Sequence, residues 1–349
     1  MKETSFILFT FLVLSFSYSA SAKDLPKFLT KQEISNLRYL SSDGKYTYYQ
    51  MKSGRLNLSL NYKTEKVLEY EKGAHYSILD YPGSDNLVVT VDETYHTRFS
   101  FRKLKKIFRL KRGTANARFL IEGISPKLHM NGTWVSVYNP YAREIHFLNL
   151  ISPAERFHIK LSNRVYQYFT PQAEMLADGR VVYTDINASG QMGLIYFQRS
   201  PLKQKTILKT NSQGLSIETC MNKSQLFILE KGLVPSQKQT HLYHIKKNEI
   251  PGNKKPKLLY QSGLNDLGMI SCRLSDSQIY FIKNYSTQNK NAFDVARIDL
   301  KQKTVSRITQ MEKIFSLIRM DQTLLVPYKG EYYVALGNAD IKKVDNLTK

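Results

Sequence analysis

The stretch LSSDGKYTYY, residues 40–49, decides how this chain folds. It joins a polar turn, built on Asp43 and Gly44, to a short run of Tyr and Thr residues. Gly accepts positive φ and Asp tolerates it, so the pair suits a tight hairpin. Tyr and Thr are enriched in strands. We therefore expect a β-strand that follows directly from a tight turn.

The same pattern of a polar turn followed by an apolar strand recurs along the chain. Residues 224–228 (SQLFI) and residues 277–281 (SQIYF) are nearly identical copies. Each turn is marked by one polar residue: Asp43, Asp85, Asn131, Asp178, Asn222, Asp276 and Asp321. Successive markers lie 42 to 54 residues apart, and the longest interval contains a polar insert at residues 246–257 that we interpret as a loop. The chain is therefore a repeat protein.

Each repeat supplies further short strands. Strands are expected at residues 56–60 and 67–70 in the first unit, and at residues 295–300 and 305–308 in the sixth. Units of this length with four short strands are typical of a β-propeller. We predict an all-β chain with four-stranded antiparallel blades, seven in number, over residues 37–349. Six blades, or two all-β sandwich domains, are the alternatives.

These units resemble the blade repeat of TolB-type and other WD40-like propellers, which has a Ser-x-Asp-Gly turn before an apolar strand. Residues 41–45 with 56–64, residues 177–184 and residues 275–304 carry the resemblance. It covers nearly all of the chain after residue 22, but the Pro of the family turn is missing and only two units keep Asp-Gly. The resemblance implies the propeller fold, six blades in TolB-type members, and an interaction role at the cell envelope. It transfers no partner-binding motif.

The first 22 residues have the three parts of a cleavable signal peptide. Lys2 is followed by an apolar run at residues 6–16 and by Ala20-Ser21-Ala22. The alternative is an uncleaved anchor, but the run is shorter than the roughly 20 residues that span a bilayer. We predict an exported protein, periplasmic or secreted, that begins at Lys23 and has no transmembrane helix. Residues 23–36 are expected to complete the short last blade.

The mature chain is expected to bind anionic surfaces. Lys and Arg number 51 against 29 Asp and Glu, a net charge of +22. Outside a cell this favours lipid head groups, acidic glycans or acidic proteins over nucleic acid. Residues 102–112 concentrate the charge in a predicted anion- or partner-binding ridge: Arg102, Lys103, Lys105, Lys106, Arg109, Lys111 and Arg112. The alternatives are a solvated strand whose lysines guard an edge, or an amphipathic membrane-surface helix.

Charged residues also fall on the strands expected to line the central channel. Lys127, Glu174 and Glu218 each lie four residues before a turn marker. Glu174 and Glu218 come from neighbouring units, so they are candidates for acid–base chemistry or cation binding at one channel mouth. The alternative is that each is salt-bridged to Lys or Arg.

Motifs specific to known chemistries are absent from the sequence. It has no Gly-x-Ser-x-Gly elbow, His-Glu-x-x-His, paired Cys-x-x-Cys, EF-hand or Gly-rich phosphate loop. His241 and His244 point to opposite faces of their expected strand, so we predict no metal and no cofactor. Cys220 and Cys272 occupy the same strand of consecutive units, and form either a disulfide between blades or two buried thiols.

These observations favour a non-enzymatic exported propeller that acts as a protein- or envelope-binding scaffold. The alternative is a lyase or hydrolase that uses the central channel to act on an acidic saccharide.

Overall fold

The fold is known from a computed structural model of the chain. It describes residues 34–40, 46–60, 63–81, 84–93, 103–162, 170–210, 215–232, 239–250, 252, 254–263, 268–272, 277–284, 293–307, 324–328, 331–335 and 341–344. The predicted signal peptide and Arg102 lie outside these residues. Apart from two short 3-10 turns, η3 (Met130–Gly132) and η4 (Lys247–Glu249), the regular elements of this part of the chain are all strands. The predicted all-β class is confirmed.

Three of the sheets are four-stranded antiparallel meanders that follow chain order. The first comprises β12 (Ala173–Met175), β13 (Val181–Ile186), β14 (Met192–Gln198) and β15 (Lys203–Lys209). The second comprises β16 (Leu215–Met221), β17 (Gln225–Gly232), β18 (Thr240–Lys246) and β19 (Lys257–Ser262). The third comprises β20 (Gly268–Ser271), β21 (Gln278–Asn284), β22 (Phe293–Asp299) and β23 (Thr304–Arg307).

A larger sheet of seven strands joins two successive repeats. It contains β5 (His75–Leu79), β6 (Asn86–Asp92), β7 (Lys105–Lys111), β8 (Ala117–His129), β9 (Trp134–Asn139), β10 (Glu144–Asn149) and β11 (Arg156–Lys160). The long strand β8 pairs with β7 up to Gly123 and with β9 from Ile124 onward. A register shift separates Ile124 from Lys127, and Ser125 between them has a φ of 50°. One strand therefore serves as the fourth strand of one repeat and the first of the next.

The other seven-stranded sheet joins the two ends of the described chain. It contains β26 (Ile341–Val344), β25 (Glu331–Ala335), β24 (Leu324–Tyr328), β1 (Ile34–Leu40), β2 (Tyr46–Met51), β3 (Arg55–Leu60) and β4 (Lys63–Glu69). One residue pair, Tyr39 with Leu324, connects β1 to β24. The first strand of the chain thus has neighbours from both termini.

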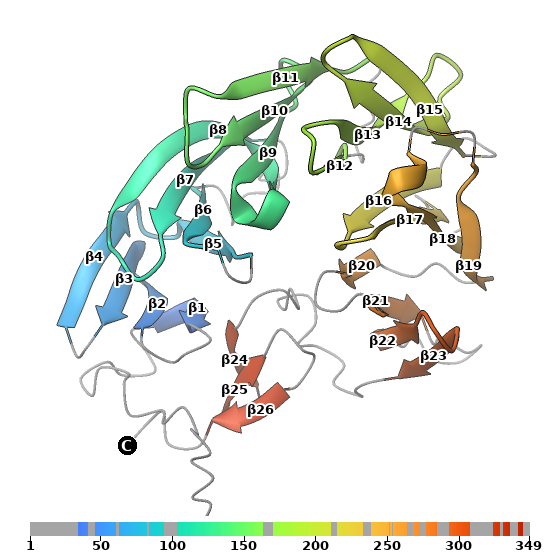
Figure 1. The fold of residues 1–349 in the computed structure, drawn as a ribbon. Helices are drawn as coiled ribbons and strands as arrows, with labels where there is room; N and C mark the ends of the chain where they lie inside the picture. The colour runs from blue at the N-terminus through green and yellow to red at the C-terminus, as the bar shows by residue number, and fades with distance from the viewer. Residues whose placement is uncertain are drawn as a thin grey trace, which may run out of the picture.

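Burial falls from the inner strands of each repeat to the outer ones. Figure 1 shows the sheets arranged about a common centre, with β1, β5, β12, β16 and β20 toward it and β4, β11, β15, β19 and β23 on the outside. Every residue of β6 is buried, whereas six of the seven residues of β4 and all seven of β15 are exposed or half-buried, and most of them carry polar side chains. A strand that is buried on both faces must lie between two packed layers.

The hydrophobic core is divided into clusters that successive repeats share. Tyr48 and Leu58 of the first repeat pack with Tyr76 and Val89 of the second. Corresponding clusters join β9–β10 to β12–β13, β13–β14 to β16–β17, and β17–β18 to β21–β22. The repeats therefore pack face to face around the molecule. In the part of the chain described, no helix has the length and apolar character needed to cross a membrane.

Candidate functional site

Innermost strands from three sheets meet at a charged cluster. Lys127 extends from β8, and its Nζ lies 2.6 Å from the Oε1 of Glu174 on β12. The same Nζ donates to the backbone carbonyl of Thr219 on β16, at 2.6 Å. The Glu174 side chain is only 1% exposed, against 22% for Lys127. One lysine therefore connects three sheets that the chain visits in succession.

A buried histidine completes this arrangement, which we name the inner cluster (Lys127, His129 and Glu174). His129 lies two residues after Lys127 on β8, and its Nδ1 is 3.5 Å from the other carboxylate oxygen of Glu174. Its Nε2 is 2.7 Å from the hydroxyl oxygen of Ser136 on β9. The imidazole is fully buried. Both oxygens of the Glu174 carboxylate thus face nitrogen atoms of the same strand.

Glu218, the second predicted channel carboxylate, forms its own ion pair with Lys231 on the neighbouring strand β17. These two side chains are 28% and 18% exposed, so solvent reaches them more readily than it reaches Glu174. Of the two carboxylates predicted from the repeat spacing, each therefore has a cation beside it.

This arrangement favours structural bonding over catalysis. A carboxylate withdrawn from water needs a compensating charge, and removing that charge leaves an uncompensated buried ion. Glu174 has an ammonium group as its partner and almost no contact with solvent. A general acid or base must instead come within hydrogen-bond distance of a substrate. The contacts of the inner cluster link β8 to β12 and β16.

The basic run forms strand β7 in its described part, so the alternative of a membrane-surface helix is wrong. The physical reason is burial on both faces, because Ile107 and Leu110 are fully buried and Phe108 nearly so. Within the run, Lys105 pairs with Asp92 at 2.8 Å and Lys106 pairs with Glu93 at 3.0 Å. The hydrogen bond that Lys106 donates to the Glu93 carboxylate raises the pKa of Lys106.

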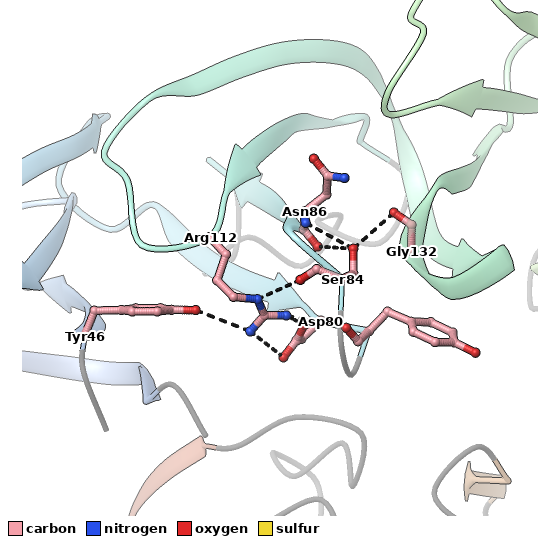
Figure 2. Close-up of polar contacts among 7 residues, drawn as sticks. Tyr46, Asp80, Ser84, Asn86, Arg112 and Gly132 are labelled. Carbon is pink, nitrogen blue, oxygen red and sulfur yellow. Dashed lines mark hydrogen bonds and ion pairs between the residues drawn. The ribbon is translucent and has the colours of Figure 1, made fainter. Parts of the chain in front are cut away.

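Arg109 on β7 and Arg112, which directly follows β7, both contact polar groups of the same sheet. Arg109 donates through Nε to the side-chain oxygen of Asn86 at 2.8 Å. Figure 2 shows Arg112 forming an ion pair with Asp80 and donating to the carbonyl oxygen of Ser84, the latter at 2.7 Å. The Arg112 guanidinium also lies 3.3 Å from the hydroxyl of Tyr46 on β2. Arg112 therefore bonds two repeats to each other.

The basic run thus divides into bonded and exposed residues. Lys105, Lys106, Arg109 and Arg112 are half-buried and each contacts an acidic or polar partner. Lys103 and Lys111 are exposed. Among the described residues of the run, these two lysines are therefore the most accessible to an anionic partner.

Cys220 and Cys272 form a disulfide bond in the structure, with their Cα atoms 5.9 Å apart. Cys220 belongs to β16 and Cys272 follows β20, so the bond joins two consecutive sheets. Both residues lie in the core cluster between those sheets. The bond is placed to hold the sheets together.

The sequence reasoning placed Lys127 and Glu174 on innermost strands but missed His129. The spacing Lys127-x-His129 was the available signal, because residues two apart share one face of a strand. The burial of that face depends on the neighbouring sheet, which a single strand pattern does not specify.

Comparison with known proteins identifies the fold and leaves the activity open. No family model matches the chain, and no curated protein matches it. Among solved structures, the tricorn protease has a TM-score of 0.56 at 12% identity, and the match covers 90% of this chain but only 35% of the protease. An uncharacterized protein, lmo1340 of Listeria monocytogenes, has a TM-score of 0.51 at 10% identity, with 90% of this chain and 95% of that chain covered.

A protein described as a TolB of Agrobacterium tumefaciens is also similar, at 11% identity over 65% of this chain and 80% of that one. Its TM-score of 0.38 is too low to carry an argument. The likeness to the first two structures supports a β-propeller-like fold. At these identities it says nothing about activity, since one fold hosts many functions.

Proposed function

We propose that this chain is an exported, non-enzymatic β-propeller that acts as a binding scaffold for a protein or an anionic surface of the cell envelope. The observation that carries this proposal is that both carboxylates predicted on the innermost strands are paired with lysines. Glu174 is buried against Lys127, and Glu218 is paired with Lys231. Because these side chains pair with each other, they support a stable framework whose outer surfaces bind a partner.

We further propose that the framework is a ring of seven TolB-like blades. The strand groups that support it are β1–β4, β5–β8, β8–β11, β12–β15, β16–β19, β20–β23 and β24–β26. In this proposed ring β8 is shared by two blades, and the Tyr39–Leu324 pair between β1 and β24 supports a link between the first blade and the last. In such a ring each blade keeps only its short outer edge.

Outer strands of the scaffold carry exposed lysines. Lys63 and Lys66 of β4 are exposed, as are Lys203 and Lys209 of β15 and Lys257 of β19. Lysines on edge strands oppose unwanted pairing with other sheets. Strands β15 and β19 carry lysines and no acidic residue, which favours a partner with an acidic surface.

The alternative function, a lyase or hydrolase acting on an acidic saccharide, gains no support from this arrangement. Such an enzyme needs a carboxylate that can approach the substrate. In the inner cluster the buried Glu174 carboxylate instead lies against Lys127 and His129.

The test compares two variants that remove the same charge from different strands. K103Q/K111Q neutralises the exposed lysines at β7, and K203Q/K209Q neutralises two exposed lysines of β15. Binding is measured by co-sedimentation with vesicles of phosphatidylglycerol and phosphatidylcholine at low salt, and with vesicles of phosphatidylcholine alone. We expect the wild-type chain to bind only the anionic vesicles, and K103Q/K111Q to bind them several-fold more weakly than K203Q/K209Q does.

Equal loss in both variants would show attraction by overall charge and contradict a role for β7. Absence of binding by the wild-type chain would contradict the anionic-surface part of the proposal. Export has a separate test, because N-terminal sequencing of the protein recovered from its host should begin at Lys23. A chain that retains Met1 would overturn it.

A further inference from the structure

A second group of chemically active side chains lies at the outer end of the seven-stranded sheet, on the hairpin β10–β11. Glu144 and His146 are two residues apart on β10, so they share one face of the strand. His158 on β11 lies directly opposite His146. The three side chains therefore stand together on one face of the hairpin. We name them the rim cluster.

The rim cluster converges on a small volume. One ligand atom from each residue can be chosen so that all three lie within 4.8 Å of one another. The Oε2 of Glu144 is 3.4 Å from the Nε2 of His146, and its Oε1 is 3.9 Å from the Nε2 of His158. Zinc bonds to imidazole nitrogen and carboxylate oxygen of about 2.1 Å put adjacent ligands of a tetrahedron about 3.4 Å apart. The Glu144–His146 distance already has that value, and the whole set lies within 4.8 Å.

The orientation of the carboxylate is the more telling observation. Lys160 lies directly opposite Glu144 in the strand register, on the same face. The Glu144 carboxylate nevertheless lies against the two imidazoles. Lys160 is exposed, so its ammonium group can extend into solvent. Glu144, His146 and His158 thus point to a common centre, although Lys160 lies opposite Glu144 and offers its carboxylate an ion pair.

We infer that Glu144, His146 and His158 form a binding site for a divalent transition metal of the zinc class. Two imidazoles and one carboxylate are the donor set of many zinc sites with three protein ligands. They leave a fourth position for water or for another ligand. The His158 side chain is 58% exposed, so this position is open to solvent.

The hairpin holds the three ligands in a fixed register. Five residue pairs join β10 to β11 without a register shift. On the opposite face, Phe147 and Phe157 stack with ring centroids 4.7 Å apart and an interplanar angle of 9°. The connecting turn is closed by Asn149, whose side-chain oxygen accepts from the backbone N–H groups of Ile151 and Ser152. Ligands on such rigid strands need little ordering when the metal binds.

The experiment measures zinc binding to the untagged, metal-stripped mature chain by competition with a chromophoric zinc chelator. The variants are H158Q and E144Q, which keep side-chain length and a polar end. H241Q is the matched control, because His241 of β18 also lies beside a carboxylate, that of Glu230, at 3.3 Å, but without a second histidine on that face. Circular dichroism confirms that each variant is folded.

We expect the wild-type chain and H241Q to bind one zinc ion with the same affinity. H158Q and E144Q should each bind it at least tenfold more weakly. Cobalt(II) added to the wild-type chain should give the visible absorption of a four-coordinate ion, and H158Q should lose it. Zinc binding that is absent in the wild-type chain, or unchanged in H158Q and E144Q, would overturn the site.

Discussion

The inner cluster and the rim cluster use the same residue types to different ends. Both contain a glutamate and a histidine, and both use strands of the seven-stranded sheet that runs from β5 to β11. The inner cluster adds a lysine and is closed to solvent at its carboxylate, which is 1% exposed. The rim cluster adds a second histidine, and its glutamate is 21% exposed. The two glutamates therefore differ in their access to solvent, and only that of the rim cluster remains open to a ligand.

The largest expected effect is from removing the buried carboxylate. Glu174→Ala leaves the Lys127 ammonium group and the His129 imidazole without their shared partner. Loss of one member of a buried ion pair costs about 3 kcal/mol or more. We expect the free energy of unfolding, measured in urea by circular dichroism, to fall by about that amount.

The matched control for this change is Glu218→Ala, because the Glu218 side chain is 28% exposed and water can replace it beside Lys231. Its effect should be about 1 kcal/mol or less, as for other solvent-exposed pairs. Equal decreases in the free energy of unfolding of the two variants would contradict the distinction between a buried carboxylate and a solvent-accessible one.

Asp80 offers a second buried partner on the central side of the sheets. Asp80→Ala removes the carboxylate that pairs with Arg112, while the carbonyl oxygen of Ser84 still accepts from the guanidinium (Figure 2). Hydrogen bonds to charged groups contribute about 1.5–3 kcal/mol. Because the Arg112 side chain is 22% exposed, hydration offsets part of the loss. We expect a decrease of about 2 kcal/mol in the urea measurement, and a smaller decrease for Asp80→Asn.

At the rim the same measurement should give almost no change in the absence of metal. The His158 side chain is 58% exposed, and substitutions at such positions usually change stability by less than about 0.5 kcal/mol. With zinc at about 100 times its dissociation constant, linkage stabilises the wild-type chain by about 2.7 kcal/mol. His158→Gln should lose most of this gain. A metal-free loss above about 1 kcal/mol would assign the rim cluster a structural role.

Much of the fold follows from local pattern. The turn at Asp178-Gly179 and the strand after it were predicted from the repeat, and β13 begins at Val181. The predicted strand at residues 295–300 corresponds to β22, Phe293–Asp299. The continuity of β8 was not predicted, since the shift near Ser125 lets one strand change partners and only the packed sheets specify that.

The sites were predicted less completely, for a related reason. Counting back from the turn markers placed Lys127 and Glu174 on innermost strands, because repeats put equivalent residues at equivalent depths. The rim cluster depends on which residue of β11 lies opposite His146, and a shift of one residue turns every side chain to the other face. The turn at Asn149 sets that register. No short metal-binding sequence motif includes such a turn, so no motif predicted the rim cluster.

The smallest expected effect is at His244, whose surroundings differ from those of the histidines in both clusters. His244 on β18 lies 2.7 Å through Nδ1 from the side-chain oxygen of Gln225, and no carboxylate dominates its surroundings. Burial lowers its pKa below the ordinary value of 6.5, and Lys257, Lys303 and Lys246 lower it further, against an opposing contribution from Glu249.

The folded chain therefore takes up this proton less readily than the unfolded chain does. The stability due to neutral His244 is present above about pH 6.5 and is lost as the pH falls from there through the folded pKa. In a histidine-selective NMR titration, the His244 midpoint should lie below 6.5, and Lys257→Gln should move it upward by a few tenths of a pH unit. Lys203→Gln, on another sheet, should leave it unchanged. A midpoint above 6.5 would contradict the expectation that burial and the neighbouring lysines control this histidine.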